Sequence, residues 1–277
     1  MSQANKYFAG LDIGGSTVKA ALVDANGAST GALVEVKSRV KEGYKTTFEQ
    51  LQEALRQLAE KANIEVSAIR GAGMDVPAPN CEGVVWTRAN LGDDWVGTNV
   101  RDELSELLGI PVYMTNDGNA AALGEYAVRP DYSGGLLLVA PGTGLGGGLV
   151  LPGGKIYAGA NGLALEVGHI SVPHREENGE LPECSCGLKG CAEAWVSLMA
   201  LRRRVSIEVA KDEWKDHPLA SDEISVIEKA FQLRDYAEKD DPLAVQIFQQ
   251  QGQILGYALA DLVRVFDPGK VVIGGGL

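Results

Sequence analysis

One pattern constrains the fold more than any other, because it occurs twice: an apolar run, a glycine-rich turn and a second apolar run. The first copy extends from Tyr7 to Val23 and turns at Gly14-Gly15. The second begins with a run at residues 135–140, passes through a glycine-dense turn and ends with a run at 148–151. Apolar runs joined by a short glycine turn predict β-hairpins. We therefore expect two halves of similar plan.

The rest of the first half alternates between strand and helix patterns. Apolar residues recur at steps of three and four between Phe48 and Ala62, which predicts a helix with one buried face. Further strands are expected at 32–40, 68–76 and 112–115, and a second helix at 98–108. This alternation predicts an α/β domain, which we expect to occupy residues 1–116.

The second half, residues 117–277, is predicted to form a larger α/β domain. It contains helix patterns at 119–126 and 243–266 and a strand pattern at 270–273. The charge-rich segment at 202–241 predicts a solvated helical insertion, in which Arg202-Arg203-Arg204 form a helix face and not an anion site. Three glycines, Gly274-Gly275-Gly276, follow the strand pattern at 270–273 and precede Leu277, the last residue of the sequence. Because a glycine turn after a buried strand normally leads into another element, we expect the complete fold to continue beyond this turn.

Composition narrows the choice of partners. A chain of 277 residues with 45% hydrophobic and 22% charged residues has the composition of a globular protein of one or two domains. Its formal charge of -12 argues against a nucleic-acid partner, because a surface that binds nucleic acid must neutralise the negative charges of the phosphates. The first residues lack the pattern of a signal peptide, and no apolar run is long enough to span a membrane. We therefore expect a cytoplasmic protein.

Both glycine turns could bind phosphate. The stretch from Asp12 to Lys19 combines an acid, two glycines and two hydroxyl residues, so backbone N–H groups can approach a phosphate there. The stretch from Gly142 to Gly148 contains G-x-G-x-x-G, but a strand follows it where a dinucleotide-binding fold needs a helix. Each turn, taken alone, also fits an ordinary hairpin. Taken together, they predict that two glycine hairpins hold a polyphosphate from two sides.

A carboxylate stands between the two hairpins, at Asn116-Asp117-Gly118-Asn119. This stretch joins a predicted strand to a predicted helix, where a carboxylate is often only a helix cap. The alternative is a catalytic base, because phosphoryl transfer to an alcohol needs a group that takes the hydroxyl proton.

A third motif predicts a metal site. Three of the four cysteines, Cys184, Cys186 and Cys191, lie within eight positions, and His169 precedes them in the stretch Glu166-Val167-Gly168-His169. Three thiolates and one imidazole complete a tetrahedral zinc site, which makes a structural zinc ion the expected occupant. The fourth cysteine, Cys81, stands apart and is expected to pack as a small apolar residue.

These motifs together resemble the ROK group of sugar kinases and related repressors, within the actin-like ATPase superfamily. The family pattern D-I-G-G-S/T-x-x-K corresponds to residues 12–19, N-D-x-N to 116–119 and G-T-G-x-G-G-G to 142–148. E-x-G-H corresponds to 166–169, and C-x-C-G-x-x-G-C-x-E to 184–193. The resemblance implies a two-domain actin-like (ribonuclease H-like) fold with phosphate-binding β-hairpins. It also implies an ATP- and Mg²⁺-dependent kinase that phosphorylates a hexose, and usually a homodimer. Family members continue past the last glycine turn through C-terminal helices, which we expect this sequence to lack.

The resemblance also implies a role for each matching residue. Asp117 is implied to be the general base. The residues implied to hold sugar hydroxyls are Asn90, Asn116, Glu166, His169 and Glu193. Asp12 is implied to position Mg²⁺, and the residues implied to hold the nucleotide are Gly14, Gly15, Ser16, Thr17, Lys19, Gly142, Thr143, Gly144, Gly146, Gly274 and Gly275.

Two departures from the family pattern affect these expectations. Ala164-Leu165 stands where the family usually has Ala-Gly, so a bulky side chain precedes a sugar-binding carboxylate. On this basis we expect an unsubstituted hexose, glucose first and at its 6-hydroxyl. The loop from His169 to Cys184 is also longer than usual and contains His174 as a rival ligand, although we favour His169. The alternatives are a kinase for fructose, allose, N-acetylglucosamine or N-acetylmannosamine, a non-catalytic sugar-binding protein, and polyphosphate as the donor.

Overall fold

The computed structural model describes residues 6–88, 91–129 and 131–276, which fall into two compact units. The first unit ends at Ala121 and also includes the returning segment Ala158–Ala164; the second consists of Ala122–Tyr157 and the chain from Leu165 onward. The returning segment packs closely on the first unit, because a Cβ on Gly162 would lie 1.9 Å from the carbonyl oxygen of Asn80. The domain boundary expected after residue 116 stays a prediction, since compactness alone does not define a domain that folds independently.

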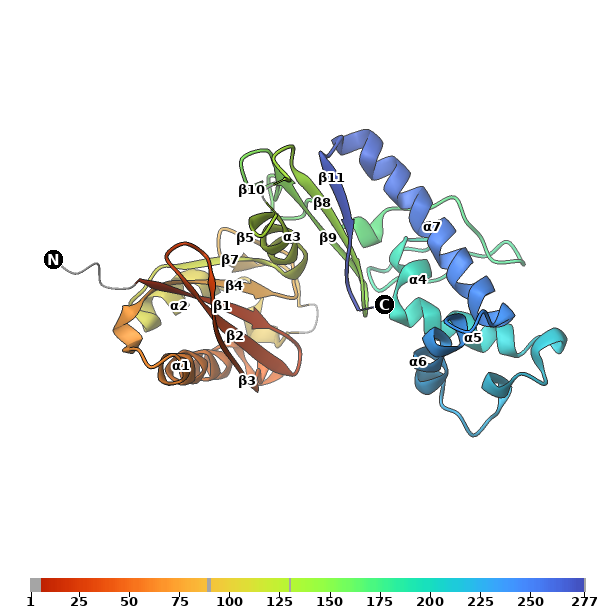
Figure 1. The fold of residues 1–277 in the computed structure, drawn as a ribbon, viewed down its shortest axis with the longest axis horizontal. Helices are drawn as coiled ribbons and strands as arrows, with labels where there is room; N and C mark the ends of the chain where they lie inside the picture. The colour runs from red at the N-terminus through yellow and green to blue at the C-terminus, as the bar shows by residue number, and fades with distance from the viewer. Residues whose placement is uncertain (1–5, 89–90, 130, 277) are drawn as a thin grey trace. The chain divides into compact units, whose positions relative to one another are not determined.

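The first unit is built on a five-stranded sheet of order β3-β2-β1-β4-β7 (Figure 1). Its strands are β1 (Tyr7–Ile13), β2 (Thr17–Asp24), β3 (Ser29–Lys37), β4 (Ile69–Val76) and β7 (Val112–Asn116). The strands β1, β2 and β3 are antiparallel neighbours, whereas β4 and β7 run parallel to β1. The hairpin predicted from the first glycine turn is therefore confirmed.

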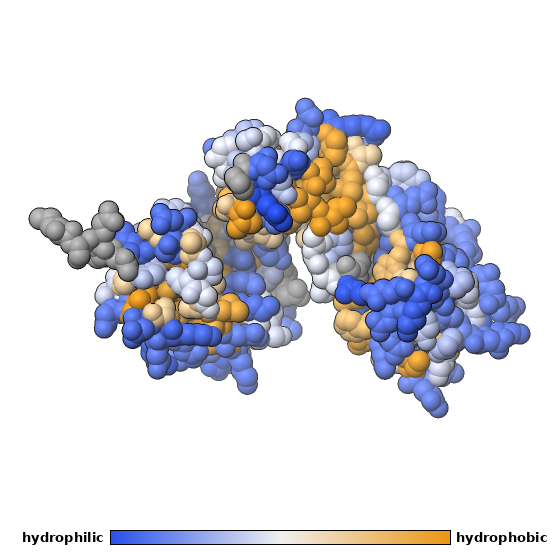
Figure 2. All heavy atoms as spheres, in the orientation of Figure 1, coloured by the Kyte–Doolittle hydropathy of each residue, from blue (hydrophilic) through white to orange (hydrophobic). Residues whose placement is uncertain are grey.

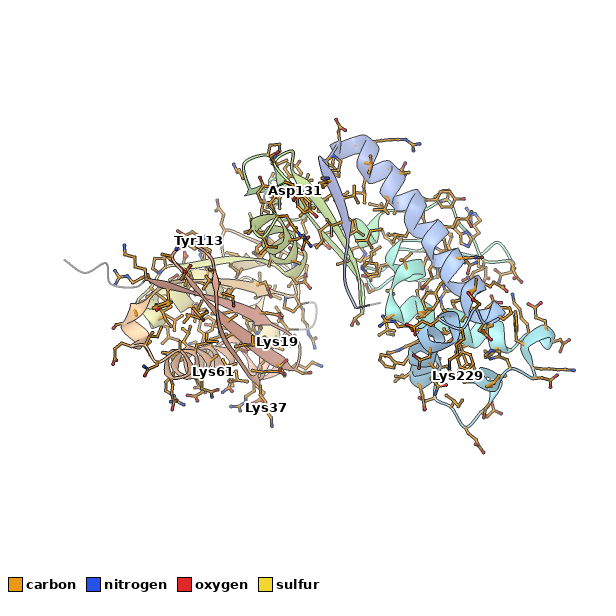
Figure 3. The ribbon with its side chains drawn as sticks, in the orientation of Figure 1. Lys19, Lys37, Lys61, Tyr113, Asp131 and Lys229 are labelled. Carbon is orange, nitrogen blue, oxygen red and sulfur yellow. The ribbon has the colours of Figure 1, made fainter. Side chains whose placement is uncertain are left out.

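Helices complete this unit. The predicted helix is α1 (Tyr44–Lys61), whose apolar stripe, including Leu51 and Leu58, is fully buried against β2 and β3. Lys61 at its end donates a hydrogen bond to the carbonyl of Leu33 on β3 (2.9 Å; Figure 3). The second helix, α2 (Val100–Leu108), packs against β7. A small hairpin of β5 (Asn80–Cys81) and β6 (Val84–Val85) follows β4. Helix α3 (Asp117–Ala127) follows β7, and only its residues up to Ala121 belong to this unit.

The second unit repeats the plan of the first. Its sheet has the order β10-β9-β8-β11, with strands β8 (Leu136–Pro141), β9 (Leu145–Leu151), β10 (Lys155–Ile156) and β11 (Lys270–Ile273). The strands β8 and β9 form the second predicted hairpin, and β11 runs parallel to β8 as β4 does to β1. The expectation of two halves of similar plan is confirmed at the level of these sheets.

The second glycine turn is shorter than predicted. Strand β9 begins at Leu145, so the glycines 146–148 are strand residues and the prediction of a strand starting at 148 was wrong. Their role is close packing: a Cβ on Gly147 would lie 2.7 Å from a methyl carbon of Val167 and 2.9 Å from the carbonyl oxygen of Leu138. Glycine in a strand often marks such an approach.

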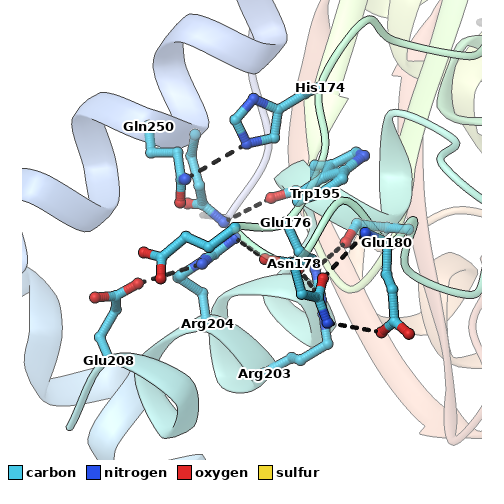
Figure 4. Close-up of polar contacts among 12 residues, drawn as sticks. His174, Glu176, Asn178, Glu180, Trp195, Arg203, Arg204, Glu208 and Gln250 are labelled. Atoms are coloured by element: carbon cyan, nitrogen blue, oxygen red, sulfur yellow. Dashed lines mark hydrogen bonds and ion pairs between the residues drawn. The ribbon is translucent and has the colours of Figure 1, made fainter. Parts of the chain in front are cut away.

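The remainder of the second unit consists of loops at residues 165–192 and of helices. It contains α4 (Glu193–Val196), α5 (Leu198–Val209), α6 (Val226–Ala237) and α7 (Pro242–Phe266), and the last three bury an apolar cluster of their own that includes Leu201, Leu233 and Ile247. The predicted solvated helix face is wrong for Arg204, whose side chain is only 6% exposed because it pairs with Glu176 and Glu208 (Figure 4).

Apolar side chains also reach the surface of this unit. Figure 2 shows apolar atoms gathered over β11 and the adjoining end of α7, where Val265 and Ile273 are exposed. Within the described part of the chain, no helix has the length and apolar character that a membrane crossing requires.

Candidate active site

Three carboxylates meet at the carboxyl edge of the first sheet. Asp12 on β1 and Asp75 on β4 are partners in the parallel register, and Asp75 is in turn the partner of Thr115 on β7. Asp117 follows two residues later as the first residue of α3. In open α/β sheets, ligands bind at the carboxyl ends of the strands, so these side chains lie where a reaction centre is expected.

Asp75 is the carboxyl group most affected by this crowding. Burial, followed by the negative charges of Asp12 and Asp117, raises its pKa to about 7, although the backbone N–H of Ile13 donates to it at 3.3 Å and opposes the rise. Asp75 also hydrogen-bonds to Asp12. The sequence reasoning missed this residue. The available signal was one acid next to the last residue of the predicted strand at 68–76.

Asp117 is accessible to solvent, yet its surroundings still perturb it. Partial desolvation raises the pKa of its carboxyl group, and the charge of Asp12 adds to the rise, while the N–H of Gly118 opposes it at 2.8 Å. The helix cap is supplied by its neighbour, because Asn116 Oδ1 accepts the N–H of Asn119 at 2.8 Å. The structure thus gives the capping role to Asn116, and Asp117 is not needed for it.

The first glycine turn begins two residues after Asp12, where β1 ends at Ile13. Gly14 N–H donates to the carbonyl of Thr17 at 2.9 Å, which closes the turn and leaves Gly15 and Ser16 exposed. Lys19 is exposed on β2, opposite Asp12 in the antiparallel register (Figure 3). The structure therefore brings the predicted residues from 12 to 19 together at one end of the hairpin.

The second glycine turn, between β8 and β9, is closed by Gly142 N–H donating to the carbonyl of Gly144 at 2.9 Å. Thr143 is exposed at its tip, and Gly146 is exposed on β9. The C-terminal glycines pack beside it: a Cβ on Gly275 would lie 2.0 Å from the carbonyl oxygen of Pro141, and Gly274 N–H donates to Val139. These two predicted nucleotide-binding segments are therefore neighbours.

The predicted metal-site residues form one cluster. One donor atom from each of His169, Cys184, Cys186 and Cys191 lies within 4.8 Å of the others. His169 Nδ1 is 3.5 Å from Cys184 Sγ, and the sulfurs of Cys186 and Cys191 are 3.7 Å apart. Burial raises the pKa of the Cys191 thiol to about 12, whereas a hydrogen bond from the Leu188 N–H lowers that of Cys186. Four such donors are compatible with structural zinc.

The rival histidine lies outside this cluster. His174 packs edge-on against the ring of Trp195, with ring centroids 4.6 Å apart, and its Nε2 is 3.4 Å from the side-chain amide of Gln250 (Figure 4). Its loop is tied to α5 by Glu176, which pairs with Arg203 and Arg204.

The predicted sugar-binding residues lie in different settings. Asn90 lies outside the described residues. Glu166 is half-buried and precedes the short helix η4 (Val167–His169). Glu193, at the start of α4, accepts the N–H of Leu145 at 3.0 Å and the hydroxyl of Ser185 at 2.7 Å. Leu165 is buried with φ +66°, a backbone conformation that favours glycine.

Comparison with known proteins identifies relatives along the whole chain. The ROK family model matches residues 8–277. A glucokinase from Halalkalibacterium halodurans is 30% identical over 99% of this chain and 81% of its own length. An N-acetylgalactosamine kinase from Shewanella sp. is 32% identical over 97% of this chain and 81% of its own.

A solved structure supports the same assignment. A ROK family glucokinase from Streptomyces griseus, in complex with glucose and AMPPNP, matches with a TM-score of 0.74 and 28% identity, over 98% of this chain and 83% of that one. The fold is therefore the actin-like ATPase fold of the ROK sugar kinases. Since the family model matches nearly all of its residues, this chain belongs to the ROK family.

Proposed function

We propose that this protein transfers the γ-phosphoryl group of ATP to a hexose, with glucose phosphorylated at its 6-hydroxyl as the first choice. The observation that carries the proposal is the meeting of Asp12, Asp75 and Asp117 at the carboxyl ends of three neighbouring chain segments. Membership of the ROK family and the similarity to a glucokinase solved with glucose and AMPPNP support it.

In the proposed reaction, Asp117 acts as the general base. As the sugar oxygen forms its bond to the γ-phosphorus, the hydroxyl proton passes to the Asp117 carboxylate, and the bond between that phosphorus and the bridging oxygen breaks to release ADP. A carboxylate with a raised pKa suits this role, because it accepts a proton more readily than an ordinary one.

The neighbouring carboxylates fit a hard cation. Mg²⁺ prefers oxygen ligands and is usually held by one or two carboxylates together with phosphate oxygens. Asp12 and Asp75 would hold it, and when bound it would neutralise charge on the phosphates. Backbone N–H groups of the first and second glycine turns would bind phosphate oxygens, with Ser16, Thr17, Lys19 and Thr143 beside them. Gly274 and Gly275 would lie beside the adenosine.

We assign the sugar hydroxyls to Glu166, His169 and Glu193, together with Asn116 and Asn90. A carboxylate accepts and an imidazole N–H donates, so inversion of one hydroxyl would leave a polar group without its partner. Leu165 directly precedes Glu166 in the sequence, at a position where the family usually has glycine. Its bulkier side chain would narrow the sugar pocket, which favours an unsubstituted hexose over an N-acetylated one.

We further propose that His169, Cys184, Cys186 and Cys191 hold one structural zinc ion. The four donors lie within 4.8 Å of one another, two of the three thiols are buried, and four ligands of these types complete a closed tetrahedral site. Zinc on one imidazole nitrogen would fix the proton on the other, which would orient the hydrogen bond that His169 donates.

Asp117→Asn tests the proposed reaction. The variant should bind hexose nearly as well as wild type but turn over about 10²–10⁴-fold more slowly, the usual contribution of a positioned base. Asp131→Asn, on an exposed loop, is the matched control and should keep its turnover. Retention of more than a tenth of wild-type turnover by Asp117→Asn would contradict the assignment of the base.

One finding favours a second candidate substrate. The 32% identical relative from Shewanella sp. is an N-acetylgalactosamine kinase, so an N-acetylhexosamine is the alternative to glucose. Comparison of kcat/KM for glucose, its epimers and the N-acetylhexosamines separates the two. A preference for an N-acetyl sugar would overturn the inference from Leu165.

A further inference from the structure

The second glycine turn is held from both ends by one short segment of chain. Glu193 Oε2 accepts the N–H of Leu145 at 3.0 Å, and Leu198 N–H donates to the carbonyl of Gly142 at 2.8 Å. We call residues 142–145 the phosphate turn. Glu193 and Leu198, five positions apart at the starts of α4 and α5, thus fix the last and first residues of this turn.

Close packing keeps this arrangement in place. A Cβ on Gly144 would lie 2.5 Å from Glu193 Oε2, so the carboxylate occupies the space that a side chain would need. A Cβ on Gly168 would likewise lie 2.4 Å from the carbonyl oxygen of Leu145. The carboxylate of Glu193 and the helix η4 therefore both rest directly on the backbone of the phosphate turn.

The same carboxylate also reaches the loop that carries the three cysteines, residues 183–191, which we call the cysteine loop. Its Oε1 accepts the hydroxyl of Ser185 at 2.7 Å and lies 3.9 Å from the sulfur of Cys184. Glu193 follows Cys191 by two residues, and the intervening Ala192 N–H donates to Ile170 at 2.8 Å. One side chain therefore connects the cluster of metal-binding donors to the turn that is expected to bind phosphate.

We propose that Glu193 is a positioning residue, which orients the backbone of the phosphate turn and makes nucleotide affinity depend on the cysteine loop. This inference rests on the proposed function and adds a second role for a residue assigned to the sugar. The two roles are compatible, because a carboxylate has about four acceptor positions and the two hydrogen bonds described use one on each oxygen.

The test separates nucleotide affinity from sugar affinity. The Kd for Mg²⁺–AMPPNP and the Kd for glucose are each measured by calorimetry for wild type, Glu193→Ala, Glu193→Gln and Ser185→Ala. Glu193→Ala should weaken nucleotide binding about tenfold or more. Glu193→Gln should restore it to within about threefold, because the amide oxygen can still accept from Leu145 and the amide N–H can donate to Ser185. Ser185→Ala should weaken nucleotide binding by about threefold.

Glu183→Ala is the matched control, because Glu183 lies on the same loop but is exposed and pairs with Lys189 at the surface. It should bind nucleotide as wild type does. An unchanged nucleotide Kd in Glu193→Ala, with weaker glucose binding, would overturn the inference and leave the proposed function intact. If Glu193→Ala does not fold, Ser185→Ala takes its place: weaker nucleotide binding supports the inference, and an unchanged nucleotide Kd overturns it.

A second measurement does not depend on any ligand. Amide hydrogen exchange of a peptide that covers the phosphate turn should be about tenfold faster in Glu193→Ala than in wild type, because the Leu145 N–H loses its acceptor. Exchange at wild-type rate would overturn the inference. If wild type binds neither AMPPNP nor glucose, the proposed function fails, and hydrogen exchange still decides whether Glu193 fixes the turn.

Discussion

Asp75 allows the electrostatics of the candidate site to be tested without an activity assay. Its pKa is about 7 in the folded protein and 3.8 for the ordinary group. Between these two pH values the folded chain holds a proton that the unfolded chain has released. The contribution of Asp75 to stability is therefore fully present below pH 3.8 and is lost as the pH rises to about 7.

The magnitude follows from the same two values. Each pH unit between 3.8 and about 7 lowers the unfolding free energy of wild type by about 1.4 kcal/mol. The rise from pH 5 to pH 8 should therefore destabilise wild type through Asp75 by about 2–3 kcal/mol. Asp75→Asn cannot ionise and should escape this loss. The difference in unfolding free energy between variant and wild type should therefore grow in favour of the variant by about 2–3 kcal/mol over this range, and should not grow further above pH 8.

Urea unfolding, monitored by circular dichroism in buffer without Mg²⁺, measures this difference at each pH. The matched control, Asp131→Asn, replaces an exposed carboxylate, and its difference from wild type should change by less than about 0.5 kcal/mol. A difference for Asp75→Asn that is constant from pH 5 to pH 8 would refute the reasoning. It would mean that Asp75 is ionised throughout, despite its burial and its two acidic neighbours.

Three further predictions concern the second unit. Metal analysis of the purified protein should find one zinc ion per chain. The His169→Ala variant should lose this zinc, whereas the His174→Ala variant should keep it. Zinc retention by His169→Ala would contradict the assigned ligand set. Leu165→Gly should be about 1 kcal/mol more stable than Leu165→Ala in urea unfolding, because residue 165 has φ +66°, which glycine adopts without the strain that a Cβ causes. The reverse order of stability would show that the backbone is not strained there. Glu176→Ala should lower the unfolding free energy by about 2–4 kcal/mol, because it removes a partner of the buried Arg204. Glu177→Ala, at the exposed neighbouring position, should lower it by less than about 1 kcal/mol. Equal losses in the two variants would contradict a special role for the buried pair.

The elements that the sequence predicted well are those whose signals are local. The turn at Gly14-Gly15 between two apolar runs predicted β1 and β2, and the spacing from Phe48 to Leu58 predicted α1. Both patterns depend on residues that are close along the chain. The length of the second hairpin turn was not predictable in this way, because Gly147 is a strand residue for a non-local reason, its packing against Val167.

The features that the sequence reasoning missed depend on contacts between distant residues. Asp75 lies 63 positions after its register partner Asp12, so only the pairing of β1 with β4 brings the two carboxylates together. The hydrogen bond from Leu145 to Glu193 spans 48 positions. Arg204 is similar: a run of three arginines predicted a solvated helix face, and its burial depends on Glu176, 28 positions earlier.

The first unit also determines what kind of ligand its glycine turn can hold. Asp12 lies two residues before this turn, and Asp75 and Asp117 lie beside Asp12 along the sheet edge. A phosphate bound by Gly14 and Gly15 would therefore approach as many as three negative charges. Two like charges about 4 Å apart repel each other by about 4 kcal/mol at an effective dielectric constant of about 20, so neighbours of this kind oppose phosphate binding. A divalent cation held by the carboxylates would convert this repulsion into attraction. Protonation of Asp75, with its pKa near 7, would remove only one of the charges. This arrangement of charges supports the proposal that a nucleotide binds together with its metal ion and that Asp117, which is exposed to solvent, takes the proton from the sugar.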